Sequence, residues 1–283
     1  MSETDPLLAV TGLTIDYPVP GGHFRAVDDV SFQVPRGRTL AIVGESGCGK
    51  STIAKALVRL LTPTNGSIVF AGNDIATLSE RRLRPVRHRI QMVFQDPYGS
   101  LDPHLTAAQI VAEAGRVRGT HGRQESHRAA VDLLDRVGLP KSAADRKPEE
   151  FSGGQRQRIG IARALAAQPD LLVCDEATSA LDVSVQAQVL DLLTTLQAET
   201  GLTYVFISHH LGVVRAISQQ VVVMSAGRIV ESGPTERVLS APQHPYTQRL
   251  RRSALDPTAM VGRKPRAVVR GVAESRAADG AAA

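Results

Sequence analysis

One stretch of the chain constrains the fold more than any other: Gly44-Glu45-Ser46-Gly47-Cys48-Gly49-Lys50-Ser51-Thr52. It fits the pattern G-x-x-x-x-G-K-[ST], which is called the P-loop. The apolar run at 39–43 is typical of a buried strand, and apolar residues at helical spacing follow the loop. Glycines let such a loop curl so that its N–H groups face an anion, and the helix dipole adds to the attraction. The stretch therefore predicts a phosphate-binding turn between a strand and a helix.

Two side chains of this loop are suited to a nucleotide. Lys50 would reach the β- and γ-phosphates, and the Ser51 hydroxyl would bind Mg²⁺. The alternative is a glycine-rich turn that matches the pattern by chance. P-loops serve kinases, GTPases, motors and transporters, so the loop predicts a nucleotide and leaves the class of protein open.

The composition is ordinary for a globular protein. With 283 residues, 42% of them hydrophobic and 22% charged, the chain is long enough for one large domain or for a core with subdomains. Aromatic residues make up only 4% and Trp is absent, which argues against a stacking surface for single-stranded nucleic acid. The net charge of +5 permits contact with an anionic surface without requiring it.

Three features of the sequence concern the compartment. No apolar run of about 18 residues or more occurs, so we expect no membrane span. The N-terminus at 1–5 is acidic and lacks the apolar region of a secretory signal. Cys48 and Cys174 do not suggest a disulfide framework, which fits a reducing cytoplasm.

Alternating strand and helix patterns predict an α/β fold. We expect strands at 13–17, 26–34, 39–43, 67–70, 90–95, 171–174 and 202–207, and a hairpin over 221–230. The region 105–168 and the segment 185–197 have helical patterns. Strands that alternate with helices usually pair in parallel, so a parallel sheet is the expected core. The tail at 256–283 is rich in Ala, Arg and Gly without periodicity, which predicts disorder.

A basic cluster lies between two of the expected strands, and it consists of Arg81, Arg82, Arg84, Arg87 and Arg89. One interpretation is a nucleic-acid patch. Pro85 interrupts the cluster and no aromatic residue lies within it, which favours a solvated basic face.

Two carboxylates follow the expected strand at 171–174. A carboxylate at a strand end beside a P-loop is where the Mg²⁺ of a bound nucleotide needs a ligand, which suits Asp175. Glu176 would polarise the attacking water, because neighbouring strand residues point in opposite directions and divide the work. The alternative is a pair of solvated acids at a strand end.

A second helix start that is suited to an anion lies about 100 residues after the first, in Phe151-Ser152-Gly153-Gly154-Gln155-Arg156-Gln157-Arg158. Ser152 is a good N-cap, and the two glycines expose backbone N–H groups. An ordinary capped helix is the alternative. The residues by themselves do not explain why one chain would carry two phosphate cradles and one P-loop lysine.

The order of these motifs resembles the ATP-binding-cassette ATPases. Ser-Gly-Gly-Gln at 152–155 matches the signature motif that separates this family from other P-loop classes. In this resemblance Gln95 falls at the Q-loop, Asp182 in the D-loop and His209 at the switch histidine. Tyr17 corresponds to the aromatic residue that stacks on adenine.

Narrower features resemble the ATPase subunits of oligopeptide, dipeptide and nickel importers, and these features lie at 93–103, 179–188 and 244–247. Two positions depart from the common pattern: Ala177 stands where many cassettes have Pro, and His210 stands where Asp usually follows the switch histidine. The doublet of His209 and His210 suggests a metal site, but adjacent strand residues would face opposite sides.

The resemblance runs from 7 to 255 and implies the domain organisation. The fold would be a P-loop NTPase core of the RecA type with a β-rich N-terminal subdomain and an inserted α-helical subdomain. The expected divisions are the core at 7–95 and 161–235, the helical signature subdomain at 96–160, an importer-family motif at 236–255 and the tail at 256–283.

The resemblance also implies a mechanism in which two cassettes pair head to tail and each ATP lies between one P-loop and the partner's signature helix. The residues that would act on the chain's own nucleotide are Lys50, Ser51, Gln95, Asp175, Glu176 and His209. Among these, Glu176 would be the general base, His209 would hold the γ-phosphate and water, and Ser51, Gln95 and Asp175 would bind Mg²⁺. The residues that would close over the partner's nucleotide are Ser152, Gly153, Gly154 and Gln155.

The expected partners are a second cassette, identical or different, and an integral membrane permease, with an extracytoplasmic solute-binding protein acting indirectly. The chain would lie at the cytoplasmic face of the membrane and import peptides or a similar small solute. A rival hypothesis keeps the cassette in a non-transport complex such as phosphonate degradation. Nucleic-acid-associated or ribosome-associated cassettes usually carry two cassettes or long coiled-coil inserts, and this chain has no sustained heptads.

Overall fold

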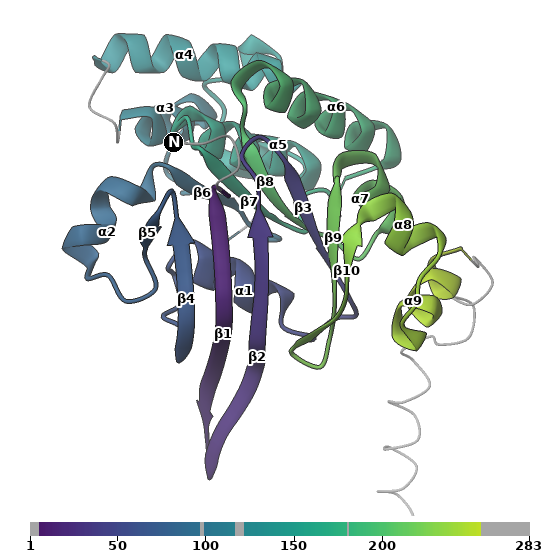
Figure 1. Cartoon of the computed structure of the whole chain (residues 1–283). Coiled ribbons are helices and arrows are strands. Elements are labelled where there is room, and N and C mark those ends of the chain that lie inside the picture. The colour runs from purple at the N-terminus through teal and green to yellow at the C-terminus, as the bar shows by residue number, and fades with distance from the viewer. Residues whose placement is uncertain (1–5, 97–98, 117–121, 180, 256–283) are drawn as a thin grey trace, which may run out of the picture.

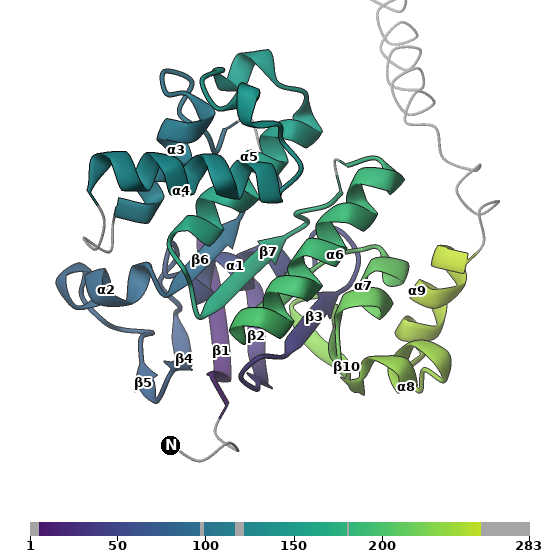
Figure 2. The same cartoon turned by 90° about the horizontal axis from the view of Figure 1, so that it is seen from above.

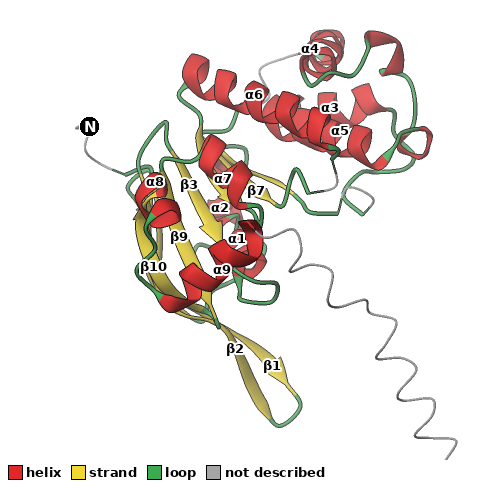
Figure 3. Ribbon diagram, turned by 90° about the vertical axis from the view of Figure 1, so that its right-hand side faces the viewer, coloured by secondary structure: helices red, strands yellow, loops and turns green. Residues whose placement is uncertain are grey.

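The computed structural model describes residues 6–96, 99–116, 122–179 and 181–255, and it contains two β-sheets with helices between and around them (Figure 1). The smaller sheet is antiparallel with the order β2-β1-β4-β5. Its strands are β1 (Leu8–Val19), β2 (Gly22–Val34), β4 (Asn65–Phe70) and β5 (Asn73–Asp74). The β1–β2 hairpin projects away from the rest of the molecule (Figure 3).

The larger sheet has the order β10-β9-β3-β8-β7-β6, in which every neighbouring pair except β9 and β10 is parallel. Its strands are β3 (Thr39–Val43), β6 (Ile90–Val93), β7 (Leu171–Asp175), β8 (Thr203–Ile207), β9 (Gln220–Ser225) and β10 (Arg228–Pro234). Strands β3, β7 and β8 are buried along their whole length, which explains why they are continuous apolar runs instead of alternating patterns.

Helix α1 (Lys50–Leu57) lies between the two sheets. Its side chains Ile53 and Leu57 are fully buried in one cluster with Val10 of the small sheet and Ile42 of the large sheet. The opposite face of the large sheet presents residues such as Leu172 and packs against the helices on that side. Both faces of the parallel sheet are therefore covered, as its connections require.

The helical region forms a group of its own on that opposite face (Figure 2). Its α-helices are α3 (Ala107–Arg116), α4 (Arg123–Arg136) and α5 (Gly153–Ala166), with 3₁₀ turns at Lys141–Ala143 and Pro148–Glu150. The remaining helices are α2 (Glu80–Arg87), α6 (Val183–Thr200), α7 (Leu211–Ile217), α8 (Thr235–Ser240) and α9 (Pro245–Leu255). Among the described residues, no helix is long and apolar enough to cross a bilayer.

The predicted fold class is confirmed, with differences at the ends of elements. The strand predicted at 90–95 ends at Val93, because Phe94 and Gln95 turn out of the sheet. The basic cluster lies mostly on α2, which continues through Pro85, and two of its guanidinium groups pair with acids: Arg87 with Glu80 and Arg89 with Asp170. The predicted domain divisions stay predictions, and the tail at 256–283 lies outside the described residues.

Candidate nucleotide site

The carboxyl ends of four parallel strands bring the predicted residues to one edge of the large sheet. In the register, Ile42 of β3 and Asp175 of β7 both face Ile207 of β8, and Val93 of β6 faces Cys174. The segments that follow these strands therefore lie side by side. Ligands of open α/β sheets bind outside such strand ends.

The P-loop has the tight curl that its glycines allow. Gly44 and Gly49 have φ values of 154° and 102°, which side-chain-bearing residues rarely adopt. A Cβ on Gly44 would lie 2.3 Å from the Met224 carbonyl oxygen, and one on Gly49 would lie 2.5 Å from the Ala26 carbonyl oxygen. Helix α1 begins directly after Gly49 with no side-chain cap, so its first N–H groups face the loop.

The Lys50 side chain folds back into this loop and is only 5% exposed. Its Nζ donates to the carbonyl oxygens of Gly44 and Glu45 at 2.9 and 2.8 Å. Cys48 is buried in the same loop, and burial raises the pKa of its thiol even though the Lys50 charge opposes this. The ammonium group is thus held at the centre of the predicted phosphate cradle.

The predicted Mg²⁺ ligands Ser51 and Asp175 meet across 124 positions of sequence. The Ser51 hydroxyl donates to Asp175 Oδ1 at 3.0 Å, and Asp175 is 3% exposed. Burial raises the pKa of Asp175, and the Ser51 hydrogen bond partly offsets this effect. A hydroxyl and a carboxylate oxygen are hard donors of the type that Mg²⁺ prefers, so the pair fits this ion.

Glu176 lies at the centre of a second group, with Gln95 and His209. Gln95 Nε2 donates to Glu176 Oε2 at 2.9 Å, and His209 Nδ1 lies 3.2 Å from Glu176 Oε1. We predicted that Asp175 and Glu176 point in different directions because they are neighbours in a strand. This reason is wrong, because β7 ends at Asp175. Glu176 instead has a left-handed φ of 48°, and this backbone turn separates the two carboxylates.

The signature stretch forms a capped helix start, as predicted. Ser152 Oγ accepts from the Gln155 N–H at 3.3 Å, and the Gln155 side chain accepts from the Ser152 N–H at 3.0 Å. A contact that the sequence did not suggest joins this helix to the strand end before Gln95: Gln157 Nε2 donates to the Phe94 carbonyl oxygen at 3.0 Å. Gln157 is 2% exposed, so a buried side chain of α5 is linked to the residue that precedes Gln95.

Comparisons with known proteins agree with this geometry. A family model described as "ABC transporter" matches residues 27–179, which is more than half of the chain. The chain is 53% identical over 254 residues to a protein of Sinorhizobium fredii named "Probable peptide ABC transporter ATP-binding protein", covering 87% of this chain and 72% of that one. This chain belongs to the ABC transporter family.

Two further similar proteins make the type of ABC protein more specific. An oligopeptide transport ATP-binding protein of Bacillus subtilis, AppF, is 53% identical, and the match covers 81% of this chain and 70% of that protein. A solved dimeric ATP-binding cassette in a post-hydrolysis state, bound to ADP and Pi, superposes with a TM-score of 0.77 at 29% identity, covering 81% of this chain and 98% of that one. The chain is therefore an ATP-hydrolysing cassette of the ABC type.

Two further predicted residues of the cassette, Tyr17 and Asp182, have clear positions. The Tyr17 hydroxyl donates to Thr52 Oγ1 at 3.5 Å, so its ring lies beside the P-loop, and the stacking on adenine stays a prediction. Asp182 caps α6 by accepting from the Val185 N–H at 2.9 Å. That hydrogen bond lowers the pKa of Asp182, with a smaller contribution from the Ser184 hydroxyl.

For the histidine doublet, the expected absence of a metal stays a prediction, and among the described residues no group of three or more candidate metal ligands occurs. The sequence argument against a metal site assumed that both histidines lie in a strand. This assumption is wrong, because β8 ends at Ile207. The rings of His209 and His210 have centroids 6.2 Å apart, and His210 occupies the N-cap position of α7 without a side-chain capping bond. Ala177, the other departure from the family pattern, is fully buried.

Proposed function

We propose that this cassette hydrolyses ATP to energise the import of peptides or a similar small solute through a separate membrane permease. The observation that carries the proposal is the meeting of Glu176 with Gln95 and His209 beside the P-loop. The relatives described above carry names of peptide transport proteins, which supports the solute class. Such a cassette acts at the cytoplasmic face of the membrane, with a solute-binding protein on the opposite side.

The chemistry is divided between the two groups of side chains. Lys50 neutralises charge on the β- and γ-phosphates, and Glu176 takes a proton from the attacking water. His209, which shares the Glu176 carboxylate with Gln95, orients that water and the γ-phosphate. Ser51 and Asp175 would hold a Mg²⁺ ion, and Gln95 would bind it through its amide carbonyl oxygen. When bound, the ion would supply positive charge next to the phosphates.

A second cassette completes the nucleotide site in this proposal. The capped start of α5 belongs to the helical group, and in a head-to-tail pair Ser152, Gly153, Gly154 and Gln155 would meet the γ-phosphate bound to the partner. The similarity to a solved dimeric cassette supports this arrangement. Val183, next to Asp182 at the start of α6, is 84% exposed in the single chain, as expected for an apolar residue at such an interface.

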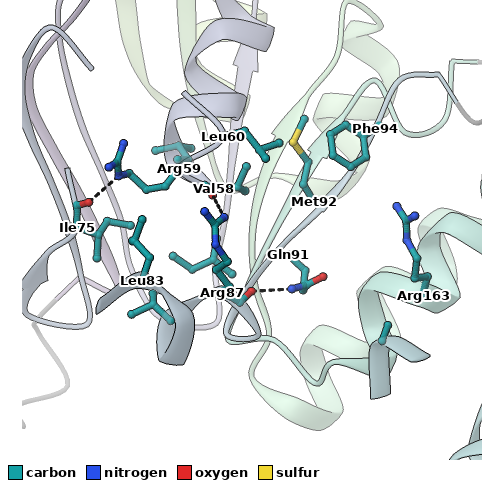
Figure 4. Close-up of a pocket in the computed structure, with 14 residues that line it drawn as sticks. Val58, Arg59, Leu60, Ile75, Leu83, Arg87, Gln91, Met92, Phe94 and Arg163 are labelled. Atoms are coloured by element: carbon teal, nitrogen blue, oxygen red, sulfur yellow. Dashed lines mark hydrogen bonds between the residues drawn. The ribbon is translucent and has the colours of Figure 1, made fainter. Parts of the chain in front are cut away.

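The permease would dock in a groove next to Gln95. This cavity of about 330 Å³ is lined by α1, α2, β6 and the helical group, with Leu83, Met92 and Phe94 among its apolar side chains (Figure 4). Arg163 of α5 lies at one side of it, and Leu60 is 57% exposed there. Phe94 precedes Gln95 and accepts from Gln157, so a helix in this groove would contact the link between the two parts of the cassette.

Replacing Glu176 by Gln tests the proposed catalysis. The amide keeps the size of the side chain and cannot take a proton, so turnover should fall by a factor of about 10²–10⁴ while MgATP still binds and traps a closed dimer. Steady-state ATPase assays and size-exclusion chromatography with MgATP measure both effects on the purified chain alone, where no different cassette supplies an intact Glu. Glu199→Gln, on the surface of α6, is the matched control. Substantial hydrolysis by the Glu176 variant would contradict its role as base.

Replacing Leu60 by Asp tests the docking groove. A charge among apolar side chains should abolish co-purification with the membrane permease and leave MgATP affinity unchanged, because Leu60 lies outside the P-loop. Val19→Asp is the control, since Val19 is also an exposed apolar residue but lies at the tip of the β1–β2 hairpin. Normal co-purification of the Leu60 variant would refute the docking site, and the absence of any membrane partner for the wild type would refute the transport role.

A further inference from the structure

The C-terminal helix α9 reaches the P-loop from the other end of the chain. The Glu45 N–H donates a hydrogen bond of 2.9 Å to the Tyr246 hydroxyl, across 201 positions of sequence. Tyr246 belongs to the stretch at 244–247, which the sequence singles out as a family feature and to which the chemistry above assigns no role. Figure 1 shows α9 at the edge of the large sheet, on the side of β10.

The hydrogen bond from Glu45 to Tyr246 involves a peptide group that also contacts Lys50. The peptide between Gly44 and Glu45 presents its N–H to Tyr246, and its carbonyl oxygen accepts from Lys50 Nζ at 2.9 Å. Gly44 has a φ of 154° and no side chain, so the backbone next to this peptide has little intrinsic preference for one orientation. Lys50 and Tyr246 together set the orientation of this peptide.

The position of Tyr246 is itself well determined. Its side chain is 6% exposed and packs in a cluster with Val43, the last residue of the strand before the P-loop, and with Val223. At the start of α9, the Glu231 carboxylate accepts from the N–H groups of Gln243 and His244 at 2.9 and 3.1 Å. The hydroxyl that meets the P-loop is therefore carried by a packed and anchored helix.

We propose that Tyr246 is a positioning residue for the nucleotide site, through which α9 holds the first peptide of the P-loop. The inference rests on the proposed role of Lys50 as a phosphate ligand. When phosphate oxygens take over the Lys50 ammonium, the Gly44 carbonyl loses that donor and Tyr246 becomes the main restraint on this peptide. Docking of α9 and binding of ATP then favour each other, because such coupling is reciprocal.

The test compares two tyrosine-to-phenylalanine variants of the full chain. Tyr246→Phe removes the hydroxyl and keeps the ring, and it should raise the dissociation constant for MgATP about three- to tenfold, the range of one net hydrogen bond. The kcat at saturating ATP should change by less than about twofold, because the reacting groups are untouched. Tyr204→Phe is the control, since its buried hydroxyl donates to the Leu193 carbonyl oxygen at 2.9 Å, away from the P-loop.

The outcomes separate this inference from the proposed function. Equal MgATP affinity of Tyr246→Phe and wild type would overturn the role of Tyr246, and so would an equal loss in Tyr204→Phe, which would indicate general destabilisation. A wild-type chain that does not bind MgATP would instead refute the proposed nucleotide site. Isothermal titration with MgATP, together with a melting curve for each variant, distinguishes these results.

A second pair of measurements does not depend on the Tyr246 variant folding. Glu231→Gln weakens the anchor of α9 without touching the P-loop, and it should raise the MgATP dissociation constant about twofold. In wild type, MgATP should slow hydrogen–deuterium exchange of the amides of α9. Unchanged exchange in α9 with and without MgATP would overturn the coupling.

Discussion

The two helices that follow glycine-rich stretches, α1 and α5, begin in opposite ways. Helix α1 starts after Gly49, which has a left-handed φ of 102° and provides no side-chain cap. Helix α5 starts at a reciprocal capping box in which Ser152 and Gln155 satisfy each other's backbone N–H groups. No side chain caps the first helix start, whereas side chains of the same chain satisfy two N–H groups at the second.

The difference suggests why one chain would carry two helix starts that are suited to an anion. The P-loop backbone surrounds the ammonium group of Lys50, which is buried inside the loop. The signature helix has only a hydroxyl and backbone dipoles at its start, which suits a contact that forms and breaks as cassettes open and close. In our proposal the first helix binds ATP in its own chain and the second closes over ATP held by a partner.

The largest effect that tests this comparison is expected from Lys50→Met. Removing the ammonium from the cradle should lower turnover by a factor of about 10²–10³, because charge that develops on the phosphates loses its main stabilising group. Lys55→Met, on the exposed side of the same helix, is the matched control and should keep wild-type turnover. Steady-state ATPase assays decide the outcome, and full activity without Lys50 would mean that α1 is not the phosphate-binding helix.

A smaller effect is expected from Ser152→Ala at the other helix start. Loss of this cap should lower the free energy of unfolding by about 1 kcal/mol. At protein concentrations where the chain is a monomer, MgATP affinity should stay unchanged, while hydrolysis by the dimer should fall.

The control for this prediction is Ser79→Ala at the start of α2. Ser79 occupies the N-cap position without a side-chain capping bond, so its removal should have almost no effect on unfolding. Denaturant unfolding curves and ATP titrations test both variants. Weakened ATP binding by the monomeric Ser152 variant would mean that α5 contacts the ATP of its own chain. This result would contradict the proposal that only α1 does so.

Local features of the site were predictable from the sequence because neighbouring residues decide them. The strand at 39–43 was predicted with the bounds of β3, and Ser152 was predicted as an N-cap, since strand patterns and caps depend on a few adjacent side chains. Errors occurred where the chain leaves regular structure. The left-handed turn at Glu176 lies where the chain leaves β7, and β6 ends at Val93, where its pairing with β7 ends. The local sequence pattern encodes neither of these positions.

By itself, the sequence determined that this chain binds a nucleotide, where the loop and the two helix starts lie, and which carboxylates lie at the end of β7. Only the tertiary structure decided that Gln95 and His209 meet at Glu176 and that Tyr246 reaches Glu45. The physical reason is distance along the chain. Contacts between residues about 30 to 200 positions apart depend on strand order and helix packing, which arise from the burial of the whole core rather than from any one segment.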